Sequence, residues 1–119
     1  MKPLMIAVVM AAIAGTALAA PWASMESLEG GSVAVTNGQA NSVWAPVAVL
    51  WKFAGATNSA LAVARVSQGA TFLLSSQNVV NASTAIWISE APYPFVCGDV
   101  LRVTSSATNG VVQIIRKGD

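Results

Sequence analysis

Residues 100–116 read VLRVTSSATNGVVQIIR and contain two short apolar runs separated by a turn sequence. The runs 100–105 and 111–116 are rich in Val, Leu, Ile and Thr, which favour a pleated, half-buried strand. Between them lies Ala107-Thr108-Asn109-Gly110, and an Asn-Gly pair readily adopts the positive φ of a tight turn. The stretch therefore predicts an antiparallel hairpin at the C-terminus.

The chain upstream of this stretch repeats the pattern of short β-forming runs divided by turn residues. We expect further strands, over 32–36, 43–53, 60–68, 70–75 and 84–89. Alternation is clearest in 60–68, where Leu61, Val63 and Arg65 share one face. Pro46 cannot donate a ladder hydrogen bond, so it marks an edge, a bulge or the true start of its strand.

With the hairpin, this makes about seven strands at regular spacing, with no convincing helix after the first twenty residues. Such a pattern is typical of an all-β chain that forms a single small antiparallel β-sandwich or barrel. A chain of 119 residues has room for one core. We therefore predict one β-sandwich domain over residues 32–119.

The first twenty residues have a different texture. Lys2 precedes an uncharged apolar run, and Ala17-Leu18-Ala19 is the small-x-small triplet that signal peptidase accepts. We interpret residues 1–19 as a cleaved signal peptide or, alternatively, as an apolar N-terminal helix retained in a membrane or in an assembly. Residues 20–31 are predicted to be a flexible segment that leads into the domain.

A cleaved leader predicts that the protein is exported to the periplasm, the cell surface or the extracellular space. An uncleaved leader would give the chain membrane contact through that N-terminal segment only. Pro21 lies close behind the proposed cleavage site, which is the main objection to cleavage.

The side-chain inventory argues against catalysis. The chain contains no histidine, which removes Ser-His-Asp and Cys-His catalysis and imidazole metal sites. Phosphate-binding glycine motifs are absent as well. Glu90 and Asp99 are the one conceivable carboxylate pair, and the plainer interpretation is a solvated acid and a turn cap. We therefore predict no enzyme activity, no metal and no cofactor.

Charge and cysteine content favour contact between proteins. Removing Lys2 with the leader leaves five basic residues, from six, against five acidic ones. Nucleic acid is then excluded as a partner, because phosphate binding needs clustered Lys and Arg. A neutral domain is also poorly protected against self-association. Cys97 is the only cysteine, and we expect it to be buried or to pair with another chain.

The segment 90–99 is the best candidate for a contact surface. Two prolines stiffen it and would hold Tyr93 and Phe95 in place. Exposed aromatic side chains on such a loop could meet a protein or a surface carbohydrate, whereas the alternative is that both fold inward and plug the sandwich. Trp22 lies in the leading segment and could dock on a neighbouring molecule. Trp22, Tyr93 and Phe95 are thus the candidate contact residues.

The segments 93–104, YPFVCGDVLRVT, and 108–113, TNGVVQ, resemble small β-sandwich proteins of bacteriophage virions. The resemblance covers the C-terminal third of the chain and lies in its turn-plus-strand texture. It implies a capsid-associated or fibre-like particle component without enzymatic activity, and it assigns no functional residue. The leader departs from that pattern.

Together these observations predict a non-enzymatic structural or interaction protein, exported or part of a virion, that acts by surface contact and self-assembly. The alternative is a carbohydrate- or ligand-binding module that uses the Tyr93/Phe95 loop.

Overall fold

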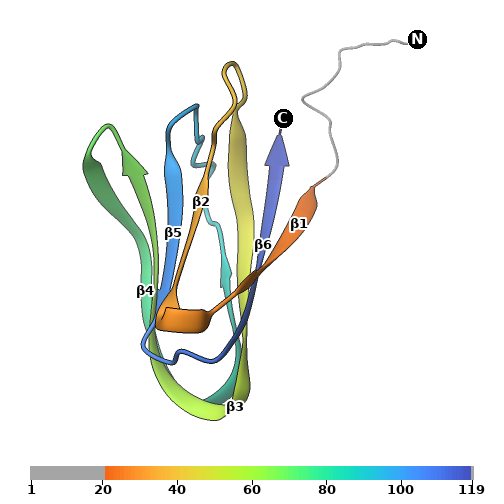
Figure 1. The fold of residues 1–119 in the computed structure, drawn as a ribbon, viewed down its shortest axis with the longest axis vertical. Coiled ribbons are helices and arrows are strands. Elements are labelled where there is room, and N and C mark those ends of the chain that lie inside the picture. Colours follow the sequence, from red (N-terminus) through yellow and green to blue (C-terminus); the bar gives the residue numbers. More distant parts are fainter. Residues whose placement is uncertain (1–20, 119) are drawn as a thin grey trace, which may run out of the picture.

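The computed structural model describes residues 21–118, so the leader predicted over 1–19 lies outside the described residues. The described chain forms six antiparallel β-strands and one short 3-10 turn (Figure 1). The elements are β1 (Trp22–Ser27), η2 (Glu29–Gly31), β2 (Ser32–Thr36), β3 (Trp44–Ser67), β4 (Ala70–Ile88), β5 (Val100–Ser105) and β6 (Gly110–Gly118). The predicted all-β antiparallel class is confirmed. No helical segment within 21–118 has the length and apolar character needed to cross a membrane.

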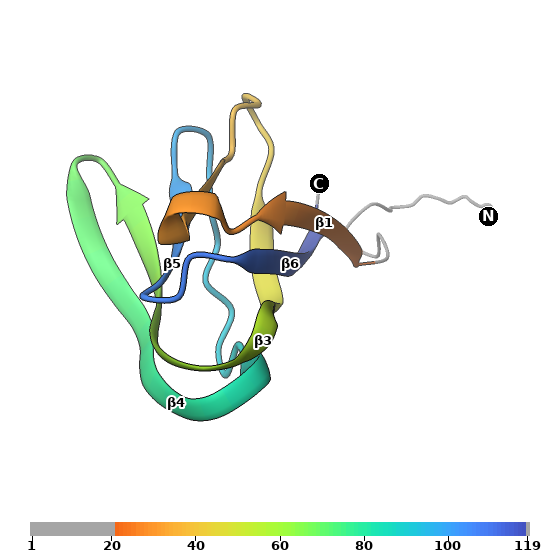
Figure 2. The same ribbon diagram turned by 60° about the horizontal axis from the view of Figure 1, so that its bottom comes forward.

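Strands β3 and β4 form a long antiparallel pair that bends near its middle, so the sheet has two arms (Figures 1 and 2). In the first arm, the start of β3 pairs with β6 on one side and with the end of β4 on the other. In the second arm, the end of β3 pairs with β5 and with the start of β4. Strand β1 extends the first arm beyond β6, and β2 extends the second beyond β5. The curled sheet brings its two arms face to face, like the layers of a sandwich.

Irregular pairing between β3 and β4 makes this bend. The register shifts between Lys52 and Thr57 and again between Thr57 and Ser59. Opposite, Asn81 has a φ of 52° and its N–H donates to Oδ1 of Asn58 at 2.7 Å. Bulges of this kind bend a strand without ending its pairing. The sequence predicted about seven separate strands, whereas the described residues form six. The predicted strands 43–53 and 60–68 merge into β3, 70–75 and 84–89 merge into β4, and β1 forms in the segment predicted to be flexible.

The C-terminal hairpin predicted from residues 100–116 is wrong, although both of its strands form. Strand β5 pairs with β2 and with the second arm of β3, whereas β6 pairs with β1 and with the first arm of β3. The connection between them passes from one arm to the other (Figure 2). In this arrangement each strand buries one face in the core between the arms. A two-stranded hairpin alone could not bury its apolar face in this way.

Two further local features follow from the pairing. The register between β3 and β6 shifts between Pro46 and Ala48, so Pro46 lies beside a bulge. A bulge was one of the three positions that the sequence allowed for this proline. Within the segment predicted to be flexible, β1 pairs with β6 from Trp22 opposite Arg116 to Ser27 opposite Val111.

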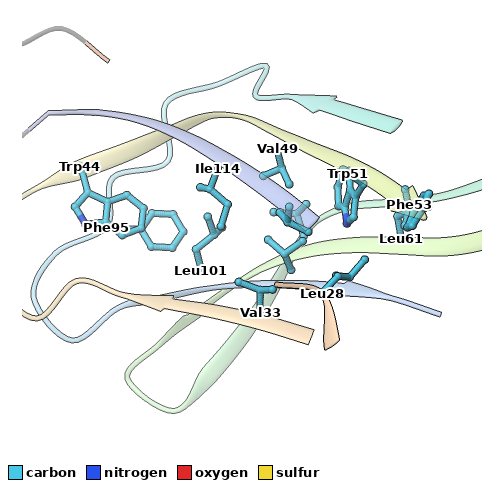
Figure 3. Close-up of a cluster of buried hydrophobic side chains, with 13 residues drawn as sticks. Leu28, Val33, Trp44, Val49, Trp51, Phe53, Leu61, Phe95, Leu101 and Ile114 are labelled. Atoms are coloured by element: carbon cyan, nitrogen blue, oxygen red, sulfur yellow. The ribbon is translucent and has the colours of Figure 1, made fainter. Parts of the chain in front are cut away.

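The core lies between the two arms and is made by alternate residues of their strands (Figure 3). Its largest fully buried side chains include Trp51, Phe95, Leu61, Leu101 and Ile114. Burial of each such side chain contributes about 1.5–3 kcal/mol relative to exposure. The inward faces of both arms are therefore occupied, and function must use an outer face, an edge or a loop.

Candidate protein-interaction surface

The outer face of the first arm is apolar, and strand alternation shows why. Val49 and Trp51 of β3 are buried in the core, so Leu50 between them points outward. In β6, Val112 and Ile114 are buried likewise. The neighbours of these two residues, Val111, Gln113 and Ile115, therefore lie on the outer side of the arm.

Pairing aligns these outward residues in rows across the four strands of the arm. Met25 of β1 lies opposite Gln113, which lies opposite Leu50, which lies opposite Ile86 of β4. The next row runs from Ala23 through Ile115 and Ala48 to Ile88. We call the following six residues the apolar face: Met25, Leu50, Ile86, Ile88, Val111 and Ile115.

Water reaches much of the apolar face. The exposed fractions are 61% for Met25, 52% for Ile86 and 61% for Ile88. A groove of about 380 Å³ crosses the face between Met25 and Ile86 and is lined in part by Leu50 and Val111. Contiguous exposed apolar surface of this kind marks a protein-contact site more often than scattered single residues do.

The outer face of the second arm differs in composition. There, Ala60 of β3 lies opposite Asn78, and Ala62 lies opposite Ser76 and Thr104. Arg102 of β5 is exposed on the same side. Leu73 of β4, opposite Ala64, is 65% exposed on this arm, and Phe72 beside it is 52% exposed. Small and polar residues thus predominate on the outer side of the second arm, whereas the first arm has rows of apolar residues that run across four strands.

Trp22 and Phe95, two of the predicted contact residues, belong to a stack of aromatic and guanidinium groups. Phe95 is fully buried, and its ring is parallel to that of Trp44, with centroids 4.7 Å apart. The guanidinium carbon of Arg116 lies 4.9 Å from the Trp44 ring centroid and 5.1 Å from that of Trp22. On the far side, the guanidinium carbon of Arg65 lies 5.6 Å from the Phe95 centroid. The stack joins β1, β3 and β6 to the loop before β5 by cation–π contacts.

Arg116 is the enclosed cation of this stack. Its Nε is buried without a hydrogen-bond partner, and Nη2 reaches Oγ of Ser24 at 3.4 Å. Burial lowers the pKa of Arg116, against an opposing contribution from Glu26. Arginine nevertheless remains charged at neutral pH. The two indole faces supply the attraction that solvent would otherwise provide to this cation.

The loop carrying Tyr93 and Phe95 does not present two exposed rings. Phe95 exchanges main-chain hydrogen bonds with Trp44, at 3.2 and 2.7 Å, and Tyr93 is half-buried against the core. The inward placement, the alternative drawn from the sequence, therefore describes Phe95. A carbohydrate platform built on both rings has no support in this geometry.

Asp99, at the end of this loop, is buried and accepts hydrogen bonds from its neighbours. Its Oδ2 accepts from Arg65 at 3.1 Å and from the N–H of Val96 at 3.0 Å. Burial alone would raise the pKa of Asp99, but hydrogen bonds from Ser67, Val96 and Arg65 hold it below its ordinary value. Asp99 is therefore a structural anion, not half of a reactive pair with Glu90. Among residues 21–118 there is no cluster of metal-ligating side chains.

Cys97 corrects another expectation. The burial expected from the sequence is wrong, because the thiol is free and exposed in the loop between β4 and β5. Pairing with another chain, the alternative drawn from the sequence, stays a prediction. Residues Val96 to Asp99 form a turn that is closed by a hydrogen bond from the Asp99 N–H to the Val96 carbonyl at 2.9 Å. Cys97 lies at the exposed corner of this turn, beside Gly98, whose φ is 95°.

The apolar face was not recognised from the sequence, although a signal exists. In 111–115, VVQII, apolar residues occupy both faces of the strand instead of alternate positions. In 86–88, IWI, the outward positions are isoleucine. A strand that is apolar on both sides is expected to be covered on both sides.

No protein-family model and no curated protein sequence matches the chain. Among solved structures, the Drosophila NLP core, described for pentamer formation and histone binding, aligns with a TM-score of 0.52 and 11% identity. It covers 84% of this chain and 98% of its own. The nucleoplasmin-like N-terminal domain of Drosophila FKBP39 aligns with a TM-score of 0.50 and 12% identity, covering 88% of this chain and 94% of its own. At these identities the similarity shows the fold, which is nucleoplasmin-like.

These structures overturn the bacteriophage resemblance and what it implied. The strand-and-turn texture of 93–113 belongs here to a nucleoplasmin-like sheet, and short Val- and Thr-rich strands after a Gly-Asp turn suit many antiparallel folds. The predicted virion component was therefore wrong. The prediction of an exported protein was wrong as well, because the fold is shared with domains such as the histone-binding NLP core.

Proposed function

We propose that this chain is a non-enzymatic assembly domain that binds further copies of itself through the apolar face. The observation that carries the proposal is the continuity of the apolar face on the first arm. Exposed Met25, Ile86 and Ile88 lie in rows that cross four paired strands, and Met25 and Ile86 border a groove of about 380 Å³. Covering exposed apolar side chains with those of a second copy removes them from water, which drives association.

Charge supports the chain itself as the partner. With six basic and five acidic residues, two copies do not repel each other at long range. Lys52 is the charged side chain that the structure places beside the groove. The similarity in fold to a domain described for pentamer formation supports a homo-oligomer further.

Histone binding is described for the same neighbour, but the charged residues of this chain do not support it. Histones are basic and need a concentrated negative surface. Here the described acids are Glu26, Glu29, Glu90 and Asp99, and Asp99 is buried beside Arg65. The proposal is therefore confined to self-association.

The experiment compares the mass of the full chain and of Met25→Lys by sedimentation velocity over a range of concentrations. A lysine at this exposed position puts like charges into the contact, and we expect the assembly to dissociate at least tenfold more readily. A wild-type chain that sediments as a monomer at every concentration would refute the proposal.

Two control variants separate apolar contact from general effects. Met25→Leu keeps an apolar side chain at the same position and should retain the assembly. Ser32→Lys places the same charge on the outer side of β2 in the second arm, where Ser32 is exposed and lies opposite Thr104, and should also retain the assembly. Loss of assembly in Ser32→Lys would mean that net charge, not the apolar face, controls association.

A further inference from the structure

Strand β4 is an unprotected edge of the sheet. Within residues 21–118 it pairs only with β3, so its other side is open along both arms. Its sequence, ATFLLSSQNVVNASTAIWI, contains no charged residue, proline or glycine. Monomeric proteins usually block such edges with lysine, proline or a covering segment, because open main-chain groups pair readily with another strand.

The main-chain groups that remain open beside the apolar face can be identified. The N–H of Ser89 donates to the carbonyl of Val47 at 2.9 Å, so Ser89 faces β3. Because main-chain groups alternate along an antiparallel strand, Trp87 and Ala85 also face β3. The N–H and C=O groups of Thr84, Ile86 and Ile88 therefore point away from the sheet.

We propose that the 84–88 segment of β4 pairs antiparallel with the same segment of a second copy, about a two-fold axis at Ile86. This inference rests on the proposed function and names one of the contacts that build the assembly. In this register Ile86 lies opposite Ile86 of the second copy. Thr84 of each copy lies opposite Ile88 of the other, which gives three pairs in total. All three are hydrogen-bonded pairs, because the open N–H and C=O groups of the two strands face one another.

The pairing also joins the two apolar faces. Opposite residues in antiparallel strands project from the same side of the sheet. The row from Met25 through Leu50 to Ile86 thus continues directly into Ile86 and Leu50 of the second copy. One sheet with a doubled apolar face results, and the segment brings no charge that would oppose the approach.

Gln77 competes for this edge. Its Nε2 donates to the carbonyl of Ile86 at 3.4 Å, from the other arm of β4. The distance is long and the contact is exposed, so a strand with better geometry displaces it. Gln77→Ala removes the competitor, and we expect the dissociation constant of the pair to fall about threefold to tenfold.

The decisive variant is Thr84→Pro, because proline removes the open N–H while leaving the hydrogen bonds to β3 intact. Thr84→Val is its control, since it keeps the N–H and a side chain of similar shape. In sedimentation of the full chain, we expect an even number of copies for the wild type and for Thr84→Val. Thr84→Pro should give half that mass, with an unchanged far-ultraviolet circular dichroism spectrum.

Hydrogen exchange of the wild-type assembly gives a second readout that needs no variant. The amides of Ile86 and Ile88 should exchange about a hundredfold more slowly in the assembly than in the same chain diluted until it sediments as a monomer. Fast exchange at both amides in the assembly would overturn the pairing even if Thr84→Pro failed to fold.

The outcomes separate the two proposals. An odd number of copies, or an unchanged mass for folded Thr84→Pro, refutes the strand pairing while dissociation of Met25→Lys still supports the proposed function. A mass that changes in neither Thr84→Pro nor Met25→Lys refutes both.

Discussion

Trp44 and Phe95 stack with an interplanar angle of 6° and also exchange main-chain hydrogen bonds as an isolated bridge. This contact fastens the loop between β4 and β5 to the first residue of β3. The loop is therefore held against the sheet, and Asp99 at its end lies 3.1 Å from the guanidinium group of Arg65 in β3.

We expect Phe95→Ala to lower the free energy of unfolding by about 3–5 kcal/mol, because it opens a cavity beside Trp44 and leaves Arg65 without its aromatic neighbour. Urea denaturation followed by tryptophan fluorescence measures the change. Pro94→Ala, at an exposed position in the same loop, should cost less than about 1 kcal/mol. Equal effects of the two substitutions would show that the stack does not stabilise the loop.

Acid should destabilise the protein through Asp99. Its pKa is lower in the folded state than the value of about 3.9 expected in the unfolded chain. The stabilisation is therefore complete above that unfolded-state value and is lost as the pH falls through the folded-state pKa. Asp99→Asn should destabilise the protein by about 1–3 kcal/mol at neutral pH and flatten the decline below pH of about 4.

Thermal unfolding of both chains between neutral and acidic pH measures that difference. Glu90→Gln, in the same loop but exposed, serves as the control and should leave the pH dependence unchanged. If the stability of Asp99→Asn falls at acidic pH as steeply as that of the wild type, groups other than Asp99 cause the acid sensitivity.

Gly110 should not tolerate a side chain. Its φ is 141°, and a Cβ there would collide with the main-chain carbonyl of Lys52. Both strain and collision act on main chain that cannot move freely, so Gly110→Ala should cost at least about 2 kcal/mol. Gly55→Ala, where the Cβ meets open space, should change stability by less than about 1 kcal/mol. Denaturant midpoints compare the two variants, and similar midpoints would contradict the close approach of β6 to β3.

A basic protein should not bind this chain at physiological salt. The described acids are few and separated, so a histone tetramer finds no concentrated negative charge. We expect no complex in co-sedimentation at micromolar concentrations and about 0.15 M salt. A stable complex under these conditions would show that this sheet meets basic partners by contacts other than charge.

Much of the local structure could be predicted from the sequence, since runs such as 100–105 and 111–116 have strand composition wherever they pair. Their partners could not be predicted. The Asn109-Gly110 turn suits a tight hairpin, yet Gly110 is needed because β6 passes close to the carbonyl of Lys52. The same residue pair thus has two explanations, and only long-range pairing distinguishes them.

The candidate surface shows the same division. Ile86 and Ile88 were visible as apolar residues of a strand, but exposure depends on which side of the sheet faces the other arm. Phe95 was a candidate for surface contact because its loop is rigid, and the structure puts its ring against Trp44 instead.

By itself, the sequence determined an all-β chain, because residue type and alternation act over a few neighbouring residues. It also determined a side-chain inventory poor in catalytic groups, without a single histidine. Tertiary structure alone decided the bend of β3 and β4, the separation of β5 from β6, and the outward position of Met25, Ile86 and Ile88. The physical reason is that a strand's two faces are chemically equivalent until distant strands pair with it and choose which face is buried.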